Sequence, residues 1–339
     1  MKKSVLWMLA WLIFVIACNN NGKKNLITYK GNVQGSFFLI KFYAGADSNS
    51  LKTGIDSLFK VVDQTASVFD SNSVISLVNA NRETELSDHF IKLFNKSQEV
   101  SYATQGNFDI TVGPLVKAWG FWKSKGVDLS KENIDSLLTY VGYNKIRIVN
   151  TSAGRHILKE HPEIMLDFNA IAQGYTADVV AEYFNNQGMK DYLIEIGGEV
   201  RASGKKESGE SWIVGIEKPA ENSDSEQEIQ EKVELNNMSL STSGNYRKYF
   251  IKDGIKYSHT IDPHTGLPVS HSLLSVTVMS DNCAEADAYA TAFMVMGVEK
   301  AKDFLKNHPG MEAYFIYSED SGILNTYKTE NFITLSSQE

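Results

Sequence analysis

Three short stretches of the chain carry side chains whose types and spacing could do chemistry. The first, "YSHTIDPHTGLPVS" (257–270), holds His259 directly before the turn sequence "DPHTG" (262–266). The turn accounts for its own aspartate, proline and glycine, because these residues set the backbone angles of tight turns. It leaves His259 unexplained, and histidine is the side chain that titrates near neutral pH. His264 and His271 are expected to be solvated.

The second stretch, "AEADAYATAFMVMG" (284–297), predicts a helix rich in small and apolar residues. Thr291 follows Asp287 by four residues, so the two side chains lie on one helical face. A carboxylate and a hydroxyl stacked in this way suit a hard cation such as Mg²⁺, which binds oxygen ligands. The alternative to a metal site, which the sequence favours equally, is that Asp287 is exposed to solvent and the Thr291 hydroxyl bonds to a carbonyl of its own helix.

The third stretch, "LDFNAIAQGYTADVV" (166–180), places Asp167 at a strand end and Gly174 in the first turn of a helix predicted over 170–187. Glycine disfavours a helix by about 1 kcal/mol relative to alanine, so something is expected to approach its backbone closely. Helix N-termini favour anions. Asp167 as a plain N-cap is the more common use of such a residue.

Two glycine-containing segments each allow two interpretations. Gly197 and Gly198 in "IGGEV" predict either a β-bulge or a place where a ligand touches the backbone. "KAWGFW" (117–122) is either aromatic core or a wall on which a flat ring stacks. The chain has no P-loop, no GxGxxG after a strand, no HExxH and no CxxC pair, which disfavours a zinc enzyme or a Rossmann dehydrogenase.

These residues are positioned by strands interspersed with helices, without regular βα alternation, a pattern that predicts an α+β fold with mixed or antiparallel sheets. A single domain over 29–335 is expected, because no convincing linker occurs. The segment 106–121 looks strand-like up to its Trp-Gly-Phe break, and the acidic stretch 220–231 predicts an exposed hairpin loop. Helices are expected over 48–66, 87–104, 130–141, 170–187, 283–297 and 298–307, with a short helical turn within 70–81.

The N-terminus has the pattern of a secretory signal, with two lysines ahead of the short apolar run "VLWMLAWLIFVIAC". The ending "VIAC" resembles the lipobox of bacterial lipoproteins, which implies cleavage after residue 17, lipidation of Cys18 and a tether over 18–28. An uncleaved anchor is the alternative. Lipidation of Cys18 would leave Cys283 alone, so no internal disulfide is expected.

Composition describes a globular protein, with 42% hydrophobic and 22% charged residues among 339. The formal net charge of −8 becomes two units more negative once Lys2 and Lys3 are removed with the signal. An acidic surface argues against nucleic acid as a partner, although an anionic ligand remains compatible with a local cation or a helix N-terminus.

Taken together and in order, the motifs resemble the ApbE family of FAD:protein FMN transferases. Besides the stretches above, "GNVQGSFF", "ASVFDSNSVISLVN", "GNFDITVGPLVKAWGF", "EIGGEVRASG" and "STSGNYRKYF" carry the resemblance. It implies the ApbE-like fold, FAD as substrate with Mg²⁺, transfer of the FMN half to a Thr or Ser hydroxyl of an acceptor protein, and release of AMP.

The resemblance also implies roles for particular residues. His259 corresponds to the general base that activates the acceptor hydroxyl. Asp287, Thr291 and the carbonyl of Ala170 correspond to metal ligands. Residues corresponding to FAD contacts are Gln34, Phe69, Ala118, Trp119, Gly120, Asp167, Gln173 and Ile261. Relatives frequently carry Lys or Glu in place of Gln173 and Tyr in place of Phe69.

Two other functions use some of the same features. A Mg²⁺-dependent FAD pyrophosphatase would use the same base and metal, with water in place of the acceptor hydroxyl. A lipoprotein that only binds flavin has no use for His259 beside a metal site. The signal and lipobox imply a protein anchored to a bacterial membrane and facing the periplasm or the exterior.

Overall fold

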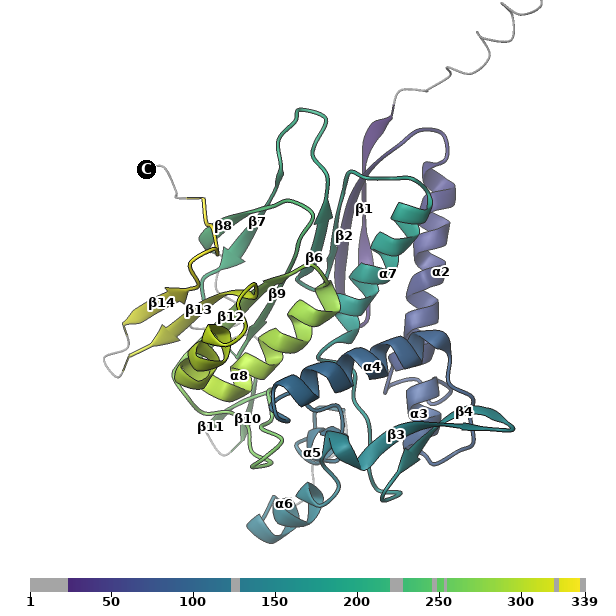
Figure 1. Ribbon diagram of the computed structural model, residues 1–339, viewed down its shortest axis with the longest axis vertical. Helices are drawn as coiled ribbons and strands as arrows, with labels where there is room; N and C mark the ends of the chain where they lie inside the picture. The colour runs from purple at the N-terminus through teal and green to yellow at the C-terminus, as the bar shows by residue number, and fades with distance from the viewer. Residues whose placement is uncertain are drawn as a thin grey trace, which may run out of the picture.

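The framework of the protein is one antiparallel sheet of eight strands (Figure 1). The computed structural model describes residues 24–122, 129–219, 228–245, 249–252, 255–319 and 323–335. In spatial order the strands are β1 (Asn25–Val33), β2 (Ser36–Ala44), β5 (Tyr192–Ile196), β6 (Glu199–Ser203), β9 (Ser239–Gly244), β12 (Leu273–Ser280), β13 (Glu312–Ser318) and β14 (Leu324–Lys328). Helices pack against this sheet, which confirms the predicted α+β class.

Three hairpins complete the strands of the described chain. They are β3 (Ile146–Thr151) with β4 (Gly154–Lys159), β7 (Trp212–Glu217) with β8 (Ile229–Leu235), and β10 (Tyr249–Lys252) with β11 (Ile255–Ser258). The helices are α2 (Ser48–Ala66), α3 (Val74–Asn79), α4 (Asp88–Ala103), α5 (Gly113–Ala118), α6 (Lys131–Leu138), α7 (Ala172–Asn186) and α8 (Cys283–Lys306), with a 3₁₀ turn at Tyr143–Lys145.

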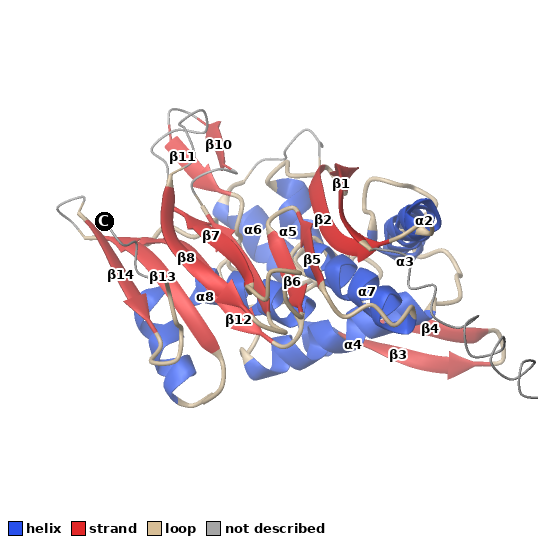
Figure 2. Cartoon of the chain, turned by 90° about the horizontal axis from the view of Figure 1, so that it is seen from above, coloured by secondary structure: helices blue, strands red, loops and turns tan. Residues whose placement is uncertain are grey.

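The sheet is covered on both faces because its side chains alternate. On one face, Ile40 of β2 and Ile194 of β5 pack against α2 and α7, and α8 covers β9 and β12. On the other face, Leu193 of β5 packs against Trp212 of β7 and Val233 of β8. Figure 2 shows β7 and β8 lying over the strands on the side away from the long helices. The β7–β8 hairpin therefore acts as a second layer.

Most helices follow the predicted apolar periodicity. α2 has the predicted bounds, and Gly297, with φ of 74°, interrupts α8 where two helices were expected to meet. The strand prediction for 106–121 is wrong, because residues 113–118 form helix α5 with a proline in its first turn, where the missing N–H costs nothing. The predicted tether is too long, since β1 begins at Asn25 and pairs along its length with β2.

Two other predictions concern segments at the margins of the described chain. The acidic stretch predicted as a hairpin loop lies largely outside the described residues, with β8 starting at Ile229. The predicted signal and Cys18 also lie outside them. Within the described ranges, no helix has the length and apolar character needed to cross a membrane.

Candidate functional site

A cleft of about 1740 Å³ opens at one end of the main sheet and gathers residues from distant parts of the sequence. The turns that follow β1 and β5, the start of α7, the end of β9 and one face of α8 all contribute to its lining. The predicted site residues that line it are Gln34, Phe69, Asp167, Ala170, Gln173, His259, Ile261, Asp287 and Thr291. The predicted base, the predicted metal ligands and most of the predicted FAD contacts thus share one cavity.

The crossing of α7 and α8 fixes Asp287 inside this cleft. Asp287 is only 6% exposed, so the solvent-exposed alternative is wrong. Its Oδ2 accepts a hydrogen bond of 3.1 Å from the N–H of Gly174 in the first turn of α7. A β-carbon on Gly174 would lie 2.4 Å from the carbonyl oxygen of Cys283. The close approach predicted at this glycine is therefore the backbone of α8 itself, and it holds a carboxylate at the N-terminus of α7.

The oxygen atoms around Asp287 fit a hard cation in type. The Thr291 hydroxyl lies one turn along α8 and 3.3 Å from the Ser243 hydroxyl of β9, and Ala170 lines the same cleft. Among the described residues, no three His, Cys, Asp or Glu side chains gather as a metal site. One carboxylate with neutral oxygens is a donor set suited to Mg²⁺, which usually takes few protein ligands and leaves positions for phosphate and water.

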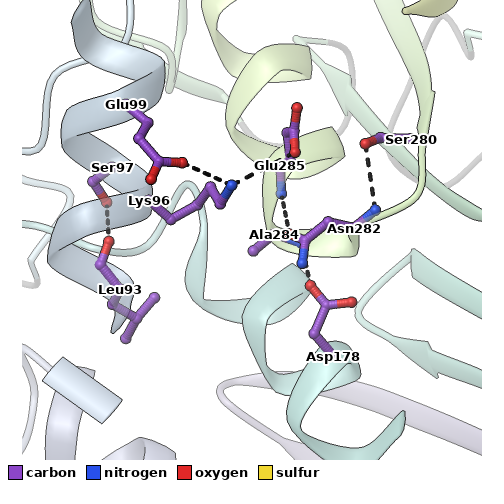
Figure 3. Close-up of polar contacts among 9 residues, drawn as sticks. All are labelled: Leu93, Lys96, Ser97, Glu99, Asp178, Ser280, Asn282, Ala284 and Glu285. Carbon is purple, nitrogen blue, oxygen red and sulfur yellow. Dashed lines mark hydrogen bonds and ion pairs between the residues drawn. The ribbon is translucent and has the colours of Figure 1, made fainter. Parts of the chain in front are cut away.

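The start of α8 is held in place by contacts from three directions (Figure 3). The Asp178 carboxylate of α7 accepts the backbone N–H groups of Cys283 and Ala284 at 3.0 and 2.9 Å. Asn282 caps the helix, because its side-chain oxygen accepts the N–H of Glu285. Lys96 of α4 lies 3.7 Å from the Glu285 carboxylate. These contacts anchor the helix that carries Asp287.

The buried environment of this helix start changes two pKa values. Burial raises the pKa of the Cys283 thiol, and the nearby carboxylates raise it further, so the thiol stays protonated. Burial also raises the pKa of Asp178 to about 6, although the N–H groups of Ala284 and Cys283 oppose the shift. Asp178 is therefore a carboxyl group that holds its proton longer in the native state than in the unfolded chain.

We expect Asp178 to make stability fall as pH rises. The pKa of Asp178 is 3.8 in its ordinary state and about 6 in the native protein. At pH values between these two, the native state keeps a proton that the unfolded chain releases. The unfolding free energy therefore falls with rising pH, by at most about 1.4 kcal/mol per pH unit for one proton. Urea titrations from pH 4 to 7 measure this slope. Asp178→Asn should lack this contribution to it, whereas Asp303→Asn, at an exposed position, should keep the wild-type slope. An unchanged slope in Asp178→Asn would contradict the assignment.

Asp167 is buried in the wall of the cleft and is not the N-cap of α7. That helix begins at Ala172, with Ile171 at the capping position. The Asp167 carboxylate instead accepts the indole N–H of Trp122 at 2.8 Å and the backbone N–H of Asn169 at 2.7 Å. Burial raises its pKa, against the effect of these hydrogen bonds. Asp167 therefore orders the loop that leads into α7.

His259 directly follows the last residue of β11 and lines the cleft. The chain then returns through a narrow hairpin, in which the N–H of Val269 bonds to the carbonyl of Thr260 at 3.0 Å. At the tip, the Asp262 carboxylate accepts the N–H of His264 at 2.8 Å, and Gly266 takes a φ of 70°. The predicted turn is present and ties down the segment that carries His259.

Trp119 supports this turn from the protein core and does not line the cleft. It is buried, and its indole N–H donates to the carbonyl of Gly266 at 2.9 Å. Ala118 lines a separate cavity of about 750 Å³, and Gly120 lines neither cavity. The aromatic-core alternative for 117–122 therefore describes Trp119, and the predicted FAD contacts at 118–120 lie outside the cleft lining in this structure.

Phe69 is the predicted FAD contact best placed for stacking on a flat ring. It lines the cleft and is 57% exposed, an unusual exposure for an aromatic residue. Gln34, in the turn between β1 and β2, donates from its amide nitrogen to Thr176 at 2.8 Å. Its buried amide oxygen has no hydrogen-bond partner among the described residues. This oxygen, at the cleft, suits an N–H donor on a ligand ring.

Of the two histidines expected to be solvated, only His264 is exposed. His271 is partly buried, and its Nε2 lies 2.7 Å from the carbonyl oxygen of Met294. A β-carbon on Gly297 would come within 3.2 Å of the His271 ring. Because the helix breaks at Gly297, His271 pairs with a carbonyl that the interrupted helix leaves available. The prediction for His271 is wrong.

Sequence reasoning missed Asp109, a buried carboxylate that lines the cleft. It accepts the backbone N–H of Thr111 at 2.8 Å, the Thr111 hydroxyl at 2.6 Å and the N–H of Tyr143 at 2.7 Å. Burial raises its pKa, and these hydrogen bonds oppose the shift. The Asp-x-Thr spacing could have indicated the local hydrogen bonds between Asp109 and Thr111. No local pattern indicates the contact with Tyr143, which lies far away in the sequence.

Comparison with known proteins gives consistent matches over nearly the whole chain. The family model described as the ApbE family matches residues 34–315. A protein of Vibrio cholerae named FAD:protein FMN transferase is 35% identical over 300 residues, covering 86% of this chain and 87% of that protein. A protein of Escherichia coli K12 with the same name is 32% identical, covering 92% of each chain.

Solved structures give the same result for the fold. The flavin transferase ApbE from Vibrio cholerae superposes with a TM-score of 0.80 at 32% identity, covering 91% of this chain and 98% of that one. The flavinyl transferase ApbE of Pseudomonas stutzeri, in its apo form, also gives a TM-score of 0.80 at 32% identity, with coverage of 92% and 96%. The described architecture is thus that of these enzymes.

Proposed function

The chain belongs to the ApbE family and is a transferase, and from this premise we propose that it transfers the FMN moiety of FAD to a Thr or Ser hydroxyl of an acceptor protein in a Mg²⁺-dependent reaction. The observation that carries this proposal is the shared cleft, in which His259 lies with Asp287 and Thr291. A general base, oxygen ligands for a hard cation and the N-terminus of α7 are the groups that phosphoryl transfer from a pyrophosphate requires.

The proposed reaction exchanges one P–O bond for another. The acceptor oxygen attacks the phosphorus on the FMN side of the pyrophosphate, and its proton passes to the imidazole of His259. The bond from that phosphorus to the bridging oxygen breaks, and AMP leaves with the bridging oxygen. Asp287, Thr291 and the carbonyl of Ala170 would hold Mg²⁺, which neutralises charge on the pyrophosphate when bound. No redox partner is needed.

FAD would lie with its phosphates near the start of α7 and its rings along the cleft. The first turn of α7 borders the cleft through Ala172 and Gln173, and the N-terminal end of a helix favours anions. Phe69 supplies an exposed aromatic face, and Gln34 supplies a buried acceptor oxygen. Gln173 lies beside Gly197, where a β-carbon would come within 2.4 Å of its amide nitrogen. The glycine there accommodates the Gln173 side chain, so Gln173 is placed at the cleft by the turn after β5.

The direct test follows both products of the reaction. The purified protein is incubated with FAD, MgCl₂ and membrane and periplasmic proteins of the source cell. Flavin fluorescence on separated polypeptides and chromatography of free AMP are then measured. A transferase yields a polypeptide heavier by one FMN, together with equimolar AMP. Free FMN and AMP without a labelled polypeptide would identify a pyrophosphatase instead, and intact FAD would identify a binding protein.

We further propose that the mature protein is a lipoprotein anchored through Cys18 and facing the periplasm or the exterior. The basic start, the short apolar run and "VIAC" support this proposal. We expect Cys18→Ser to leave the protein unprocessed or to release it from membranes, with Asn20→Ser as the control. Membrane fractionation and the mass of the mature chain measure both. A Cys18→Ser variant that fractionates and migrates like the parent would contradict the lipid anchor.

A further inference from the structure

The catalytic cleft is larger than its proposed FAD site requires. Sites for small ligands and cofactors usually measure about 300–1,000 Å³, whereas this cleft measures about 1740 Å³. The predicted FAD, metal and base residues line only one part of it. The rest continues past the turn after β5 and runs over the opposite face of the main sheet. A two-substrate reaction provides a reason for this additional space.

The additional part of the cleft is a groove between the outer face of β2 and β5 and the strand β7. Phe37, Leu39 and Lys41 alternate with the core residues of β2 and therefore share the outer face. The register pairs Leu39 with Glu195 and Lys41 with Leu193, so β5 continues the same face. This outer face forms the floor of the groove. From Phe37 to Lys41 it is about 13 Å long, enough for about four extended residues.

The groove exposes apolar side chains on both sides. Phe37 of β2 is 49% exposed, and Ile213 of β7, which alternates with the buried Trp212, is 48% exposed; both line the cleft. Scattered exposed apolar residues need no explanation, but a contiguous exposed group beside a reaction site indicates a binding surface. The groove lies at the entrance to the catalytic part, because Phe37 is close to Gln34 in the chain and its carbonyl accepts the N–H of Gly197 at 2.8 Å.

One wall of the groove is the strand β7, one edge of which pairs with no other described strand. β7 pairs only with β8 among the described strands. The cleft is lined by residues of β7 and by none of β8, so the side of β7 away from β8 faces the groove. Figure 2 shows β7 between β8 and the strands β5 and β6. An edge strand offers backbone N–H and C=O groups to an extended peptide, which can add to it as a further strand.

Charged side chains of both signs border the groove. Lys41 and Glu217 both lie close enough to Glu195 to change the pKa of its carboxyl group. Burial raises that pKa, Lys41 lowers it and Glu217 raises it. Lys206 lines the far end. A groove with apolar walls and balanced charge suits a polypeptide with apolar and mixed charged side chains, and is poorly suited to a second nucleotide, which is strongly anionic.

We infer that this groove is the docking site of the acceptor protein, which binds as an extended segment along the edge of β7 away from β8 and presents its hydroxyl residue at the turn after β5. The inference rests on the proposed transfer reaction and specifies where its second substrate lies. The segment enters over Phe37 and Ile213, and the hydroxyl reaches the catalytic part of the cleft where FAD and His259 meet.

The test separates acceptor binding from the chemistry of FAD. The probe is a synthetic peptide of 15 residues centred on the hydroxyl residue that the wild-type protein labels, mapped by mass spectrometry. Ile213→Asp and Phe37→Asp place a charge in the groove, and Ile333→Asp is the matched control, at an isoleucine that is 72% exposed and outside the cleft. We expect the two groove variants to raise the KM for the peptide roughly 10- to 100-fold.

Two further readouts should stay at wild-type levels in the groove variants. These are the dissociation constant for FAD and the rate of AMP release without peptide, because neither Ile213 nor Phe37 belongs to the catalytic set. Equal peptide KM values in groove and control variants would overturn the docking site while leaving the transferase intact. A wild-type protein that labels no polypeptide would overturn the proposed function and this inference together.

Hydrogen exchange gives an answer independent of any substitution. A peptide with alanine at the modified position binds without reacting. We expect it to slow amide exchange in 212–217, because a docked strand forms hydrogen bonds with the edge of β7 away from β8. Protection confined to other strands, such as β14 at the far edge of the sheet, would overturn the inference.

Discussion

His259→Ala is expected to lower FMN transfer by roughly 10²- to 10⁴-fold, the usual contribution of a general base. His259 lines the cleft that also holds Asp287 and Thr291, and the turn that follows it is fixed by its own hydrogen bonds. FAD affinity should change little, because in the proposed mode FAD is held by Mg²⁺ at Asp287 and Thr291, by Phe69 and by the start of α7. Single-turnover transfer rates and FAD titrations measure the two effects separately.

The pH dependence gives a second readout for His259. A histidine base must be neutral to accept a proton, so the transfer rate should rise through the range of about pH 5 to 8 in which histidines titrate. The variant should lose this rising limb. His264→Ala is the matched control, since His264 lies five residues away on the same turn, is exposed and does not line the cleft. A variant that loses FAD binding and transfer together would show that His259 is structural, and Asp167 would become the next candidate base.

Asp287→Asn is expected to lower Mg²⁺-dependent transfer by roughly 10²-fold or more, because a metal ligand contributes several kcal/mol to stabilising charge in the transition state. The amide keeps an oxygen that can accept the N–H of Gly174, which now bonds to the Asp287 carboxylate. The fold should therefore be preserved. A titration of transfer rate against Mg²⁺ concentration should show a much weaker metal requirement or none that saturates.

Asp287→Ala should differ from Asp287→Asn in stability. It removes the acceptor for Gly174 at a buried helix crossing, so we expect an additional loss of about 1–3 kcal/mol in unfolding free energy. Glu299→Gln is the control on the same helix, because the Glu299 side chain is exposed and does not line the cleft. Wild-type activity of Asp287→Asn across the Mg²⁺ titration would leave Asp287 as a structural cap for α7 alone.

Local features of the fold could be predicted from the sequence because they depend on neighbouring residues. Apolar periodicity placed α2 at its observed bounds, and Gly297 marked the break in α8. The four-residue spacing put Asp287 and Thr291 on one helical face. Helix α5 was missed because its apolar and β-branched residues fit a strand equally well, and only a proline in its first turn indicates a helix.

The sequence by itself singled out His259 and Asp287 through residue types and short spacings, and the resemblance to the ApbE family implied the roles that we propose for them. Only the tertiary structure decided which of these side chains face the cleft. Trp119 supports the turn from the core, Asp167 is buried under Trp122, and Gly174 accommodates a helix instead of a ligand. Burial and contact depend on how distant segments pack, and local periodicity carries no information on that packing. The groove beside β7 exists only because a hairpin covers part of one face of the sheet and leaves the rest open.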